Sequence, residues 1–151
     1  MTIQEHGYQQ ATRLIKSGNL PQALICGNDD LAMGTLAAFA DHGISVPDDL
    51  LLSGYDDTVA GQFATTPLTS IRPRVSEATR AAVKHLLAMI EKPEANFPKP
   101  GNTIFLNDIV LRRSSGSIEA LSALLENGLP ETASRVTVEQ AREGSILKRT
   151  Q

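Results

Sequence analysis

The chain has little of what many small proteins use for covalent or aromatic chemistry. Among its 151 residues there are one cysteine, four phenylalanines, two tyrosines and no tryptophan. A single cysteine, Cys26, excludes an internal disulfide. It follows the apolar residues Ala23, Leu24 and Ile25, which favours a buried small hydrophobe over a reactive thiol.

An excess of charge and long apolar runs are also absent. The net charge is -3 at pH 7, and no stripe of Lys and Arg follows the chain as it would in a protein that neutralises phosphates along a duplex. The segment Met1–Gln10 is polar and does not look like a signal peptide, and no run approaches the ~20 apolar residues that span a bilayer. We therefore expect a soluble, cytoplasmic chain that binds neither DNA by itself nor a membrane.

The residues that are present have the composition of an ordinary globular domain. Hydrophobic residues make up 41% and charged residues 21% of the chain, which is enough to bury a core. Apolar residues at helical spacing predict three helices, and the third is expected to have one buried face. Shorter apolar runs between turn residues predict three strands, and the first two are expected to be buried. The predicted helices are Thr2–Lys16, Asn28 to Gly43, and one from near Ser76 to before Pro93; the predicted strands are Pro21–Gly27, Leu50–Tyr55 and Thr103–Leu111.

The first half of the chain thus contains a strand–helix–strand unit. Such crossovers are right-handed and join parallel strands in nearly all cases, so the polar clusters that follow the two strands share the carboxyl edge of one sheet. Ligands of open α/β sheets bind at that edge, and Asn28 and Asp56 are the candidates there. An amide donates and accepts while a carboxylate accepts twice, which suits a polyol. The alternative is that Asn28 only caps a helix and Asp56 only caps a turn.

The order of several short motifs adds a more specific signal. These motifs are the segments 23–34 (ALICGNDDLAMG), 43–49 (GISVPDD), 53–57 (SGYDD), 67–73 (PLTSIRP) and 111–115 (LRRSS). Together they resemble the effector-sensing part of the LacI/GalR regulators, and the resemblance covers about Gln4 to Gly116.

The resemblance implies an α/β fold with a parallel sheet, a periplasmic-binding-protein-like (type I) sensor lobe that is incomplete here. Residues 1–116 would be the carboxyl-terminal portion of that sensor domain, with Thr58–Pro73 crossing between lobes. Residues 117–151 would be a carboxyl-terminal extension with a short helix at 118–125 and a polar tail.

The same resemblance implies a function and partners. Asn28 and Asp56 would contact a small-molecule effector, a sugar or a nucleobase-like compound, and lobe closure would couple effector binding to operator DNA through a headpiece that this chain does not contain. A homodimer is implied, with Leu31, Leu36 and Val59 as candidate interface residues, although burial within one subunit is an equal alternative. No cofactor, metal or enzymatic activity is implied.

Two other classes remain open from the residues alone. A transport-system sugar-binding protein would share the fold. A magnesium-dependent phosphoacceptor domain would use carboxylates at strand ends, although no glycine-rich phosphate loop is present. The residues that such a domain would use are Asp29, Asp30, Asp56, Asp57, Thr58 and Lys84. The three histidines fall on different predicted helices, which favours surface roles.

Overall fold

The computed structural model describes residues 1–91, 103–117, 119 and 136–138. Its α-helices are α1 (Ile3–Lys16), α2 (Asp29–Asp41), α3 (Val59–Gln62) and α4 (Val75–Glu91). Its strands are β1 (Ala23–Ile25), β2 (Leu51–Tyr55), β3 (Thr69–Arg72), β4 (Asp108–Leu111) and β5 (Val136–Val138), and a 3-10 turn η1 covers Arg113–Ser115. The predicted α/β class is confirmed.

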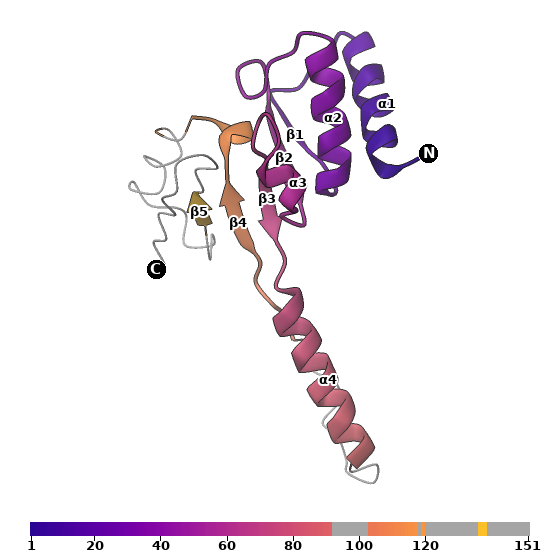
Figure 1. Cartoon of the computed structure of the whole chain (residues 1–151), viewed down its shortest axis with the longest axis vertical. Coiled ribbons are helices and arrows are strands. Elements are labelled where there is room, and N and C mark those ends of the chain that lie inside the picture. The colour runs from indigo at the N-terminus through magenta and orange to yellow at the C-terminus, as the bar shows by residue number, and fades with distance from the viewer. Residues whose placement is uncertain (92–102, 118, 120–135, 139–151) are drawn as a thin grey trace.

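The strands form one sheet in the order β1-β2-β3-β4-β5. β1 pairs with β2, β2 with β3, and β4 with β5 in parallel, whereas β3 and β4 are antiparallel. The antiparallel pair arises because the chain leaves β3 into α4 and returns along β4 (Figure 1). The strand–helix–strand unit predicted from the sequence is therefore present, and its two strands are parallel as expected.

Side-chain caps fix the starts of the first two helices. Thr2 Oγ1 accepts from the Glu5 backbone N–H at 3.1 Å while the Glu5 carboxylate accepts from the Thr2 N–H at 2.6 Å, a complete capping box. Asn28 Oδ1 accepts from the Leu31 N–H at 2.9 Å and begins α2 directly after the β1 turn. The end of β1 and the start of α2 are thereby held close together.

The hydrophobic core lies between the sheet and the helices α1 and α2. Phe39 and Leu68 are fully buried, and Cys26 is half-buried against this cluster, as the sequence predicts. β1 departs from the prediction of a buried strand, because it is the edge strand and Ile25 is 81% exposed. The buried core residues are Ala11, Ala32, Ala38, Phe39, Val46, Leu50, Leu52 and Leu68.

Helices α1 and α2 approach each other through two glycines. A Cβ at Gly34 would overlap the carbonyl oxygen of Gln4, and a Cβ at Gly7 would overlap that of Leu31. Both glycines are buried. The two helices therefore meet backbone to backbone, closer than side chains would allow.

Helix α4 differs from the prediction of a buried face. It extends away from the sheet (Figure 1), and none of its residues is buried. Leu86 and Ile90 are 57% and 65% exposed. The helix also begins at Val75, so that Ser76 lies inside the first turn and is not the cap.

Three other expectations are changed or fall outside the described residues. The segment 58–73 contains α3 and β3 and is not extended throughout, and β4 covers only Asp108–Leu111 of the predicted strand. The predicted helix at 118–125 lies outside the described residues except for residue 119. Among the helices that are described, none has the length and apolar character needed to cross a membrane.

Candidate functional site

The candidate site lies where β1, β2 and β3 end at one edge of the sheet. β1 ends at Ile25 and leads to Asn28, and β2 ends at Tyr55 and leads to Asp56. Because β1, β2 and β3 are parallel, their carboxyl ends share that edge. The structure therefore brings both predicted ligand-contacting residues to the edge at which open α/β sheets bind ligands.

Asn28 combines the capping role with a free donor. Its Oδ1 is occupied by the Leu31 N–H, whereas its Nδ2 has no hydrogen-bond partner among the described residues. The side chain is half-buried. Beside Asn28 lies an open hollow of about 440 Å³ that is also lined by Met1, Thr2, Ile3, His6 and Leu31.

Asp56 is exposed and has an unusual backbone. Its φ is 109°, and the next residue, Asp57, has a φ of 53°, in the region that residues other than glycine rarely adopt. The Asp56 N–H donates to the Ile71 carbonyl at 2.9 Å, but within the described part of the chain its carboxylate accepts no hydrogen bond. The turn thus presents an unpaired carboxylate to solvent.

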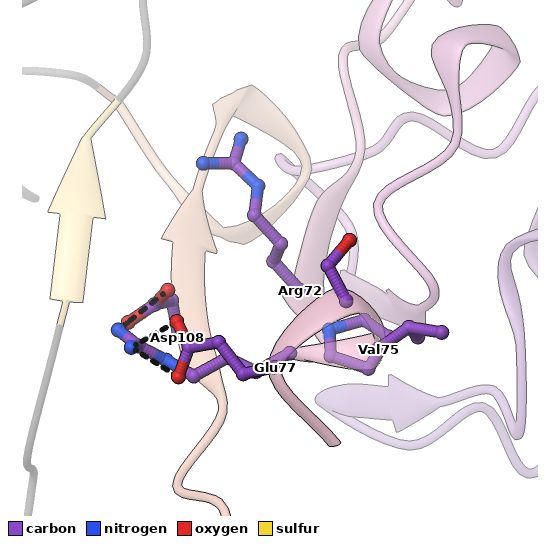
Figure 2. Close-up of a pocket in the computed structure, with 7 residues that line it drawn as sticks. Arg72, Val75, Glu77 and Asp108 are labelled. Carbon is purple, nitrogen blue, oxygen red and sulfur yellow. Dashed lines mark hydrogen bonds and ion pairs between the residues drawn. The ribbon is translucent and has the colours of Figure 1, made fainter. Parts of the chain in front are cut away.

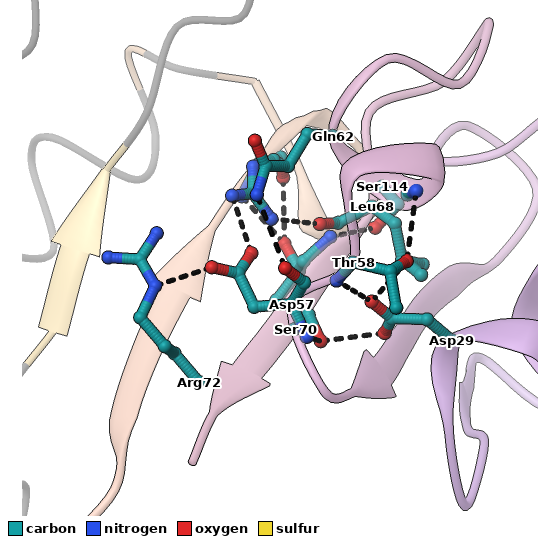
Figure 3. A network of polar contacts seen from close by, with 11 residues as sticks. Asp29, Asp57, Thr58, Gln62, Leu68, Ser70, Arg72 and Ser114 are labelled. Carbon is teal, nitrogen blue, oxygen red and sulfur yellow. Dashed lines mark hydrogen bonds and ion pairs between the residues drawn. The ribbon is translucent and has the colours of Figure 1, made fainter. Parts of the chain in front are cut away.

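Asp29, the first residue of α2, joins three elements at the same edge (Figure 3). Its Oδ2 accepts from the Thr58 N–H at 2.7 Å and from Thr58 Oγ1 at 3.0 Å, and its Oδ1 accepts from Ser70 Oγ at 2.6 Å. Asp29 is 1% exposed, and Gly54 leaves the space that its carboxylate occupies. The start of α2 is therefore tied to the segment after β2 and to β3.

Asp57 lies between two arginines, and Figure 3 shows its carboxylate pointing toward one of them, Arg72. Its Oδ2 accepts from Arg72 Nε, and its Oδ1 is 2.7 Å from Arg112 Nη2. The Arg112 side chain is 1% exposed and also donates to the Leu68 carbonyl at 2.8 Å. Two cationic groups therefore compensate one carboxylate in the interior.

The segment after β4 completes this polar layer. Ser114 is fully buried; its Oγ donates to the Leu52 carbonyl at 2.6 Å and accepts from the Thr69 N–H at 2.8 Å. Thr69 Oγ1 in turn accepts from the Arg112 N–H at 2.7 Å. The sequence motifs 67–73 and 111–115 thus meet in space, a contact that the spacing along the chain does not reveal.

A second hollow lies at the start of α4 (Figure 2) and has a volume of about 400 Å³. Arg74 donates to Asp108 Oδ1 at 3.0 Å and to Glu77 Oε1 at 2.9 Å. Hydrogen bonds first from Asp108 and then from Glu77 raise the pKa of Arg74 above its usual value. Two carboxylates, Asp108 and Glu77, therefore compensate the positive charge of Arg74 in this hollow.

The candidate interface residues differ in exposure. Leu36 is half-buried and packs against the core, and Leu31 is half-buried beside Gly7. Val59, the first residue of α3, is 70% exposed. Of the three, Val59 is the residue that this chain itself leaves most open to another molecule.

Among the described residues, three of the four acidic residues that a phosphoacceptor site would need are held by other groups, and only Asp56 is not. Asp29 accepts from hydroxyl and backbone donors, Asp57 is paired with arginines, and Asp30 accepts from Gln4 Nε2 at 3.0 Å. Over the described ranges, no group of three or more His, Cys, Asp or Glu side chains is placed to hold a metal ion. The geometry therefore does not favour magnesium chemistry.

Comparison with known proteins gives a consistent result. Residues 1–115 match the periplasmic binding protein-like domain. The chain is 34% identical over 114 residues to the HTH-type transcriptional repressor PurR of Haemophilus influenzae (strain PittEE), covering 76% of this chain and 34% of the repressor. It is 35% identical over 95 residues to the HTH-type transcriptional repressor ExuR of Bacillus subtilis, covering 63% and 28%. The chain spans about a third of the length of these relatives.

Three solved structures with a similar fold are described as regulators of the LacI family or as the lac repressor. A LacI-family regulator from Sanguibacter keddieii superposes with a TM-score of 0.70 and 31% identity, covering 76% of this chain and 42% of that one. The lac repressor dimer bound to operator and an anti-inducer gives 0.66 and 27%, covering 75% and 38%. A LacI-family regulator from Enterococcus faecium with bound ribose gives 0.64 and 25%, covering 75% and 40%. These relatives are regulators and not enzymes.

Proposed function

This chain belongs to the LacI family of transcriptional regulators, and we propose that its residues 1–116 form the carboxyl-terminal portion of a sensor domain that binds a sugar or a related polyol. The effector would bind at the carboxyl edge of β1 and β2, against Asn28 and Asp56. In this proposal the protein is not an enzyme and uses no cofactor. Residues 117–151 would be a carboxyl-terminal extension, which contributes β5 to the sheet through its pairing with β4.

The observation that carries the proposal is the state of Asp56. Its carboxylate is exposed, accepts no hydrogen bond from the described residues and is held on a backbone of φ 109°. Unfavourable backbone of this kind costs roughly 1–3 kcal/mol and tends to persist at functional sites. Asn28, at the same edge, has an amide Nδ2 that donates to no acceptor in the part of the chain that the structure describes. A carboxylate and an amide together match the donors and acceptors of neighbouring hydroxyl groups.

The relatives support the wider role. We propose that in the full-length regulator the effector shifts an equilibrium between two lobe arrangements, and that a DNA-reading segment outside this chain gains or loses its operator as a result. A homodimer would present two such segments to a two-fold operator, with Val59 as the most exposed of the candidate interface residues. A regulator of this kind would act in the cytoplasm.

A thermal-shift screen tests the effector proposal. The purified chain is heated with sugars, sugar phosphates, nucleosides and purines, and a ligand that binds the folded state raises the melting temperature. Asp56→Ala is expected to weaken the affinity for the selected ligand by at least about ten-fold, because a charge-assisted acceptor is lost.

Asp30→Ala is the matched control. It removes an exposed carboxylate on the first turn of the same helix that Asn28 caps, but one that accepts from Gln4 on α1. Its affinity should equal that of the parent. If Asp56→Ala binds as tightly as the parent, Asp56 is not part of the site and the effector proposal fails at this edge.

A further inference from the structure

The turn at Asp56 and Asp57 has an unfavourable backbone conformation, which other contacts must stabilise. Two successive residues other than glycine have positive φ, 109° and 53°, and the first of these lies outside even the left-handed helical region that Asn and Asp tolerate. Among the described residues, Asp56 is held by one hydrogen bond, from its N–H to the Ile71 carbonyl. The forces that fix the turn must therefore come mainly from its neighbour.

Asp57 is held by hydrogen bonds at its N–H, its carbonyl and Oδ2, and by an ion pair at Oδ1. Its N–H donates to Ser70 Oγ at 3.0 Å, and its carbonyl accepts from Gln62 Nε2 at 3.2 Å. Its carboxylate, on a side chain 3% exposed, contacts Arg72 through one oxygen and Arg112 through the other. A residue fixed at four points determines the backbone on either side of it.

The two arginines come from different parts of the fold. Arg112 is buried and bonded to the Leu68 carbonyl, so it belongs to the interior of the lobe. The Arg72 side chain is 42% exposed, and Arg72 is the last residue of β3, where the chain leaves the sheet toward α4. Asp57 is thus joined both to the interior and to the end of the strand that leads out of the lobe.

We propose that Asp57 is a positioning residue: its paired carboxylate holds the Asp56–Asp57 turn in the conformation that presents the Asp56 carboxylate at the sheet edge, and Arg72 links that conformation to the end of β3. The role of Asp56 as an effector contact rests on the proposed function. The role of Asp57 in fixing the turn does not, because it follows from the bonds around Asp57 alone.

Hydrogen exchange of single backbone amides tests this role without a ligand. Asp57→Asn keeps the side-chain volume and a residue type that tolerates positive φ, and removes only the charge that pairs with the arginines. The Asp56 N–H, bonded to the Ile71 carbonyl at 2.9 Å, is expected to exchange at least about ten-fold faster in this variant, because the turn opens locally.

The Leu51 N–H, bonded to the Gln22 carbonyl at 2.9 Å, lies at the opposite end of β2 from the turn and should keep its parent rate. Equal acceleration at both amides, or none at Asp56, would show that Asp57 contributes only general stability and would overturn the proposal. If Asp57→Asn does not fold, Arg72→Gln removes the half-exposed partner alone and is judged by the same comparison.

Asp29→Asn is the matched control variant. Asp29 is an equally buried carboxylate at the same edge, but it accepts from Thr58 and Ser70 and not from arginines. Its substitution is expected to accelerate exchange of the Thr58 N–H while leaving the Asp56 N–H at its parent rate. If both variants accelerate exchange of the Asp56 N–H to the same extent, Asp57 has no specific role in fixing the turn, and the proposal is wrong.

A double-mutant cycle on effector affinity separates the two proposals. With the compound that gives the parent its largest thermal shift, Asp57→Asn should weaken binding several-fold in the parent background and have no further effect once Asp56→Ala is present. Equal losses in both backgrounds would mean that Asp57 acts independently of Asp56. If neither variant weakens effector binding, the proposed effector site is refuted. The hydrogen-exchange data would still decide whether Asp57 fixes the turn.

Discussion

Two regions of the molecule differ in how far their apolar side chains are buried. One is the lobe formed by α1, α2 and β1–β3, and the other is the helix α4, although both contain amphipathic segments. In the lobe, Phe39 and Leu68 are fully buried. On α4, Leu86 and Ile90 are more than half exposed, and no residue of the helix is buried. Periodicity along a helix thus identifies which face is apolar, but it does not identify the surface that covers that face.

The same contrast separates α1 from α4. Both helices carry apolar residues at three- and four-residue steps, and both were predicted from them. Helix α1 packs on α2 because Gly7 and Gly34 let the two backbones approach. Helix α4 has no such partner among the described residues. Its apolar side chains therefore contribute little to the free energy of folding of this chain.

The largest expected difference between the two regions is in the cost of deleting a large apolar side chain. Phe39→Ala, at a fully buried position, should lower the free energy of unfolding by about 3–5 kcal/mol. Leu86→Ala, at a position 57% exposed, should change it by less than about 0.5 kcal/mol. Urea unfolding followed by circular dichroism measures both, and similar losses would mean that α4 is packed in solution.

A smaller difference is expected between a buried and an exposed carboxylate. Asp29→Ala leaves the Thr58 and Ser70 donors without their acceptor in the interior and should cost about 2–4 kcal/mol. Glu77→Ala removes an exposed partner of Arg74 on α4 and should cost less than about 1 kcal/mol. The same unfolding measurement applies, and a Glu77 effect as large as that of Asp29 would contradict the comparison.

The smallest difference is kinetic and concerns thiols. Burial raises the pKa of Cys26 above its usual value, an effect only partly offset by its hydrogen bond to Thr35. Less thiolate is therefore present at pH 8, and Cys26 should react with iodoacetamide more slowly than a free cysteine. A cysteine placed on α4 by Ala88→Cys, in the Cys26→Ser background, should react at the free rate. Equal rates at the two positions would show that the edge of the lobe opens readily.

Much of the fold could be predicted from the sequence because its elements have local signals. Thr2, Asn28 and Gly43 mark helix ends through caps and turn chemistry, and the parallel pairing of β1 with β2 follows from the handedness of crossovers. The edge position of β1 was missed because a short apolar run looks the same in the sequence whether the strand lies at the edge or in the centre of a sheet. The short helix α3 was missed because one turn carries no periodic pattern.

The candidate site was predictable only in part. Asn28 and Asp56 could be placed because each directly follows a strand. Whether either residue contacts an effector, and whether Leu31, Leu36 or Val59 lies in a dimer interface, remains a prediction. The pairing of Asp57 with Arg72 and Arg112 could not be foreseen, since up to 55 residues separate the partners along the chain and only the antiparallel return of β4 beside β3 brings them together.

The contact between α1 and α2 has a consequence for reading mutational data. Because Gly7 and Gly34 lie against carbonyl oxygens of the opposite helix, every other amino acid at these positions forces the two helices apart. In a saturation scan scored for the effector response that we propose, the two buried glycines would therefore rank beside the proposed contacts Asn28 and Asp56. Sensitivity to substitution at Gly7 and Gly34 would therefore indicate that the spacing of α1 and α2 matters. A residue that contacts the effector would instead be identified by a substitution that abolishes the response while the protein abundance stays normal.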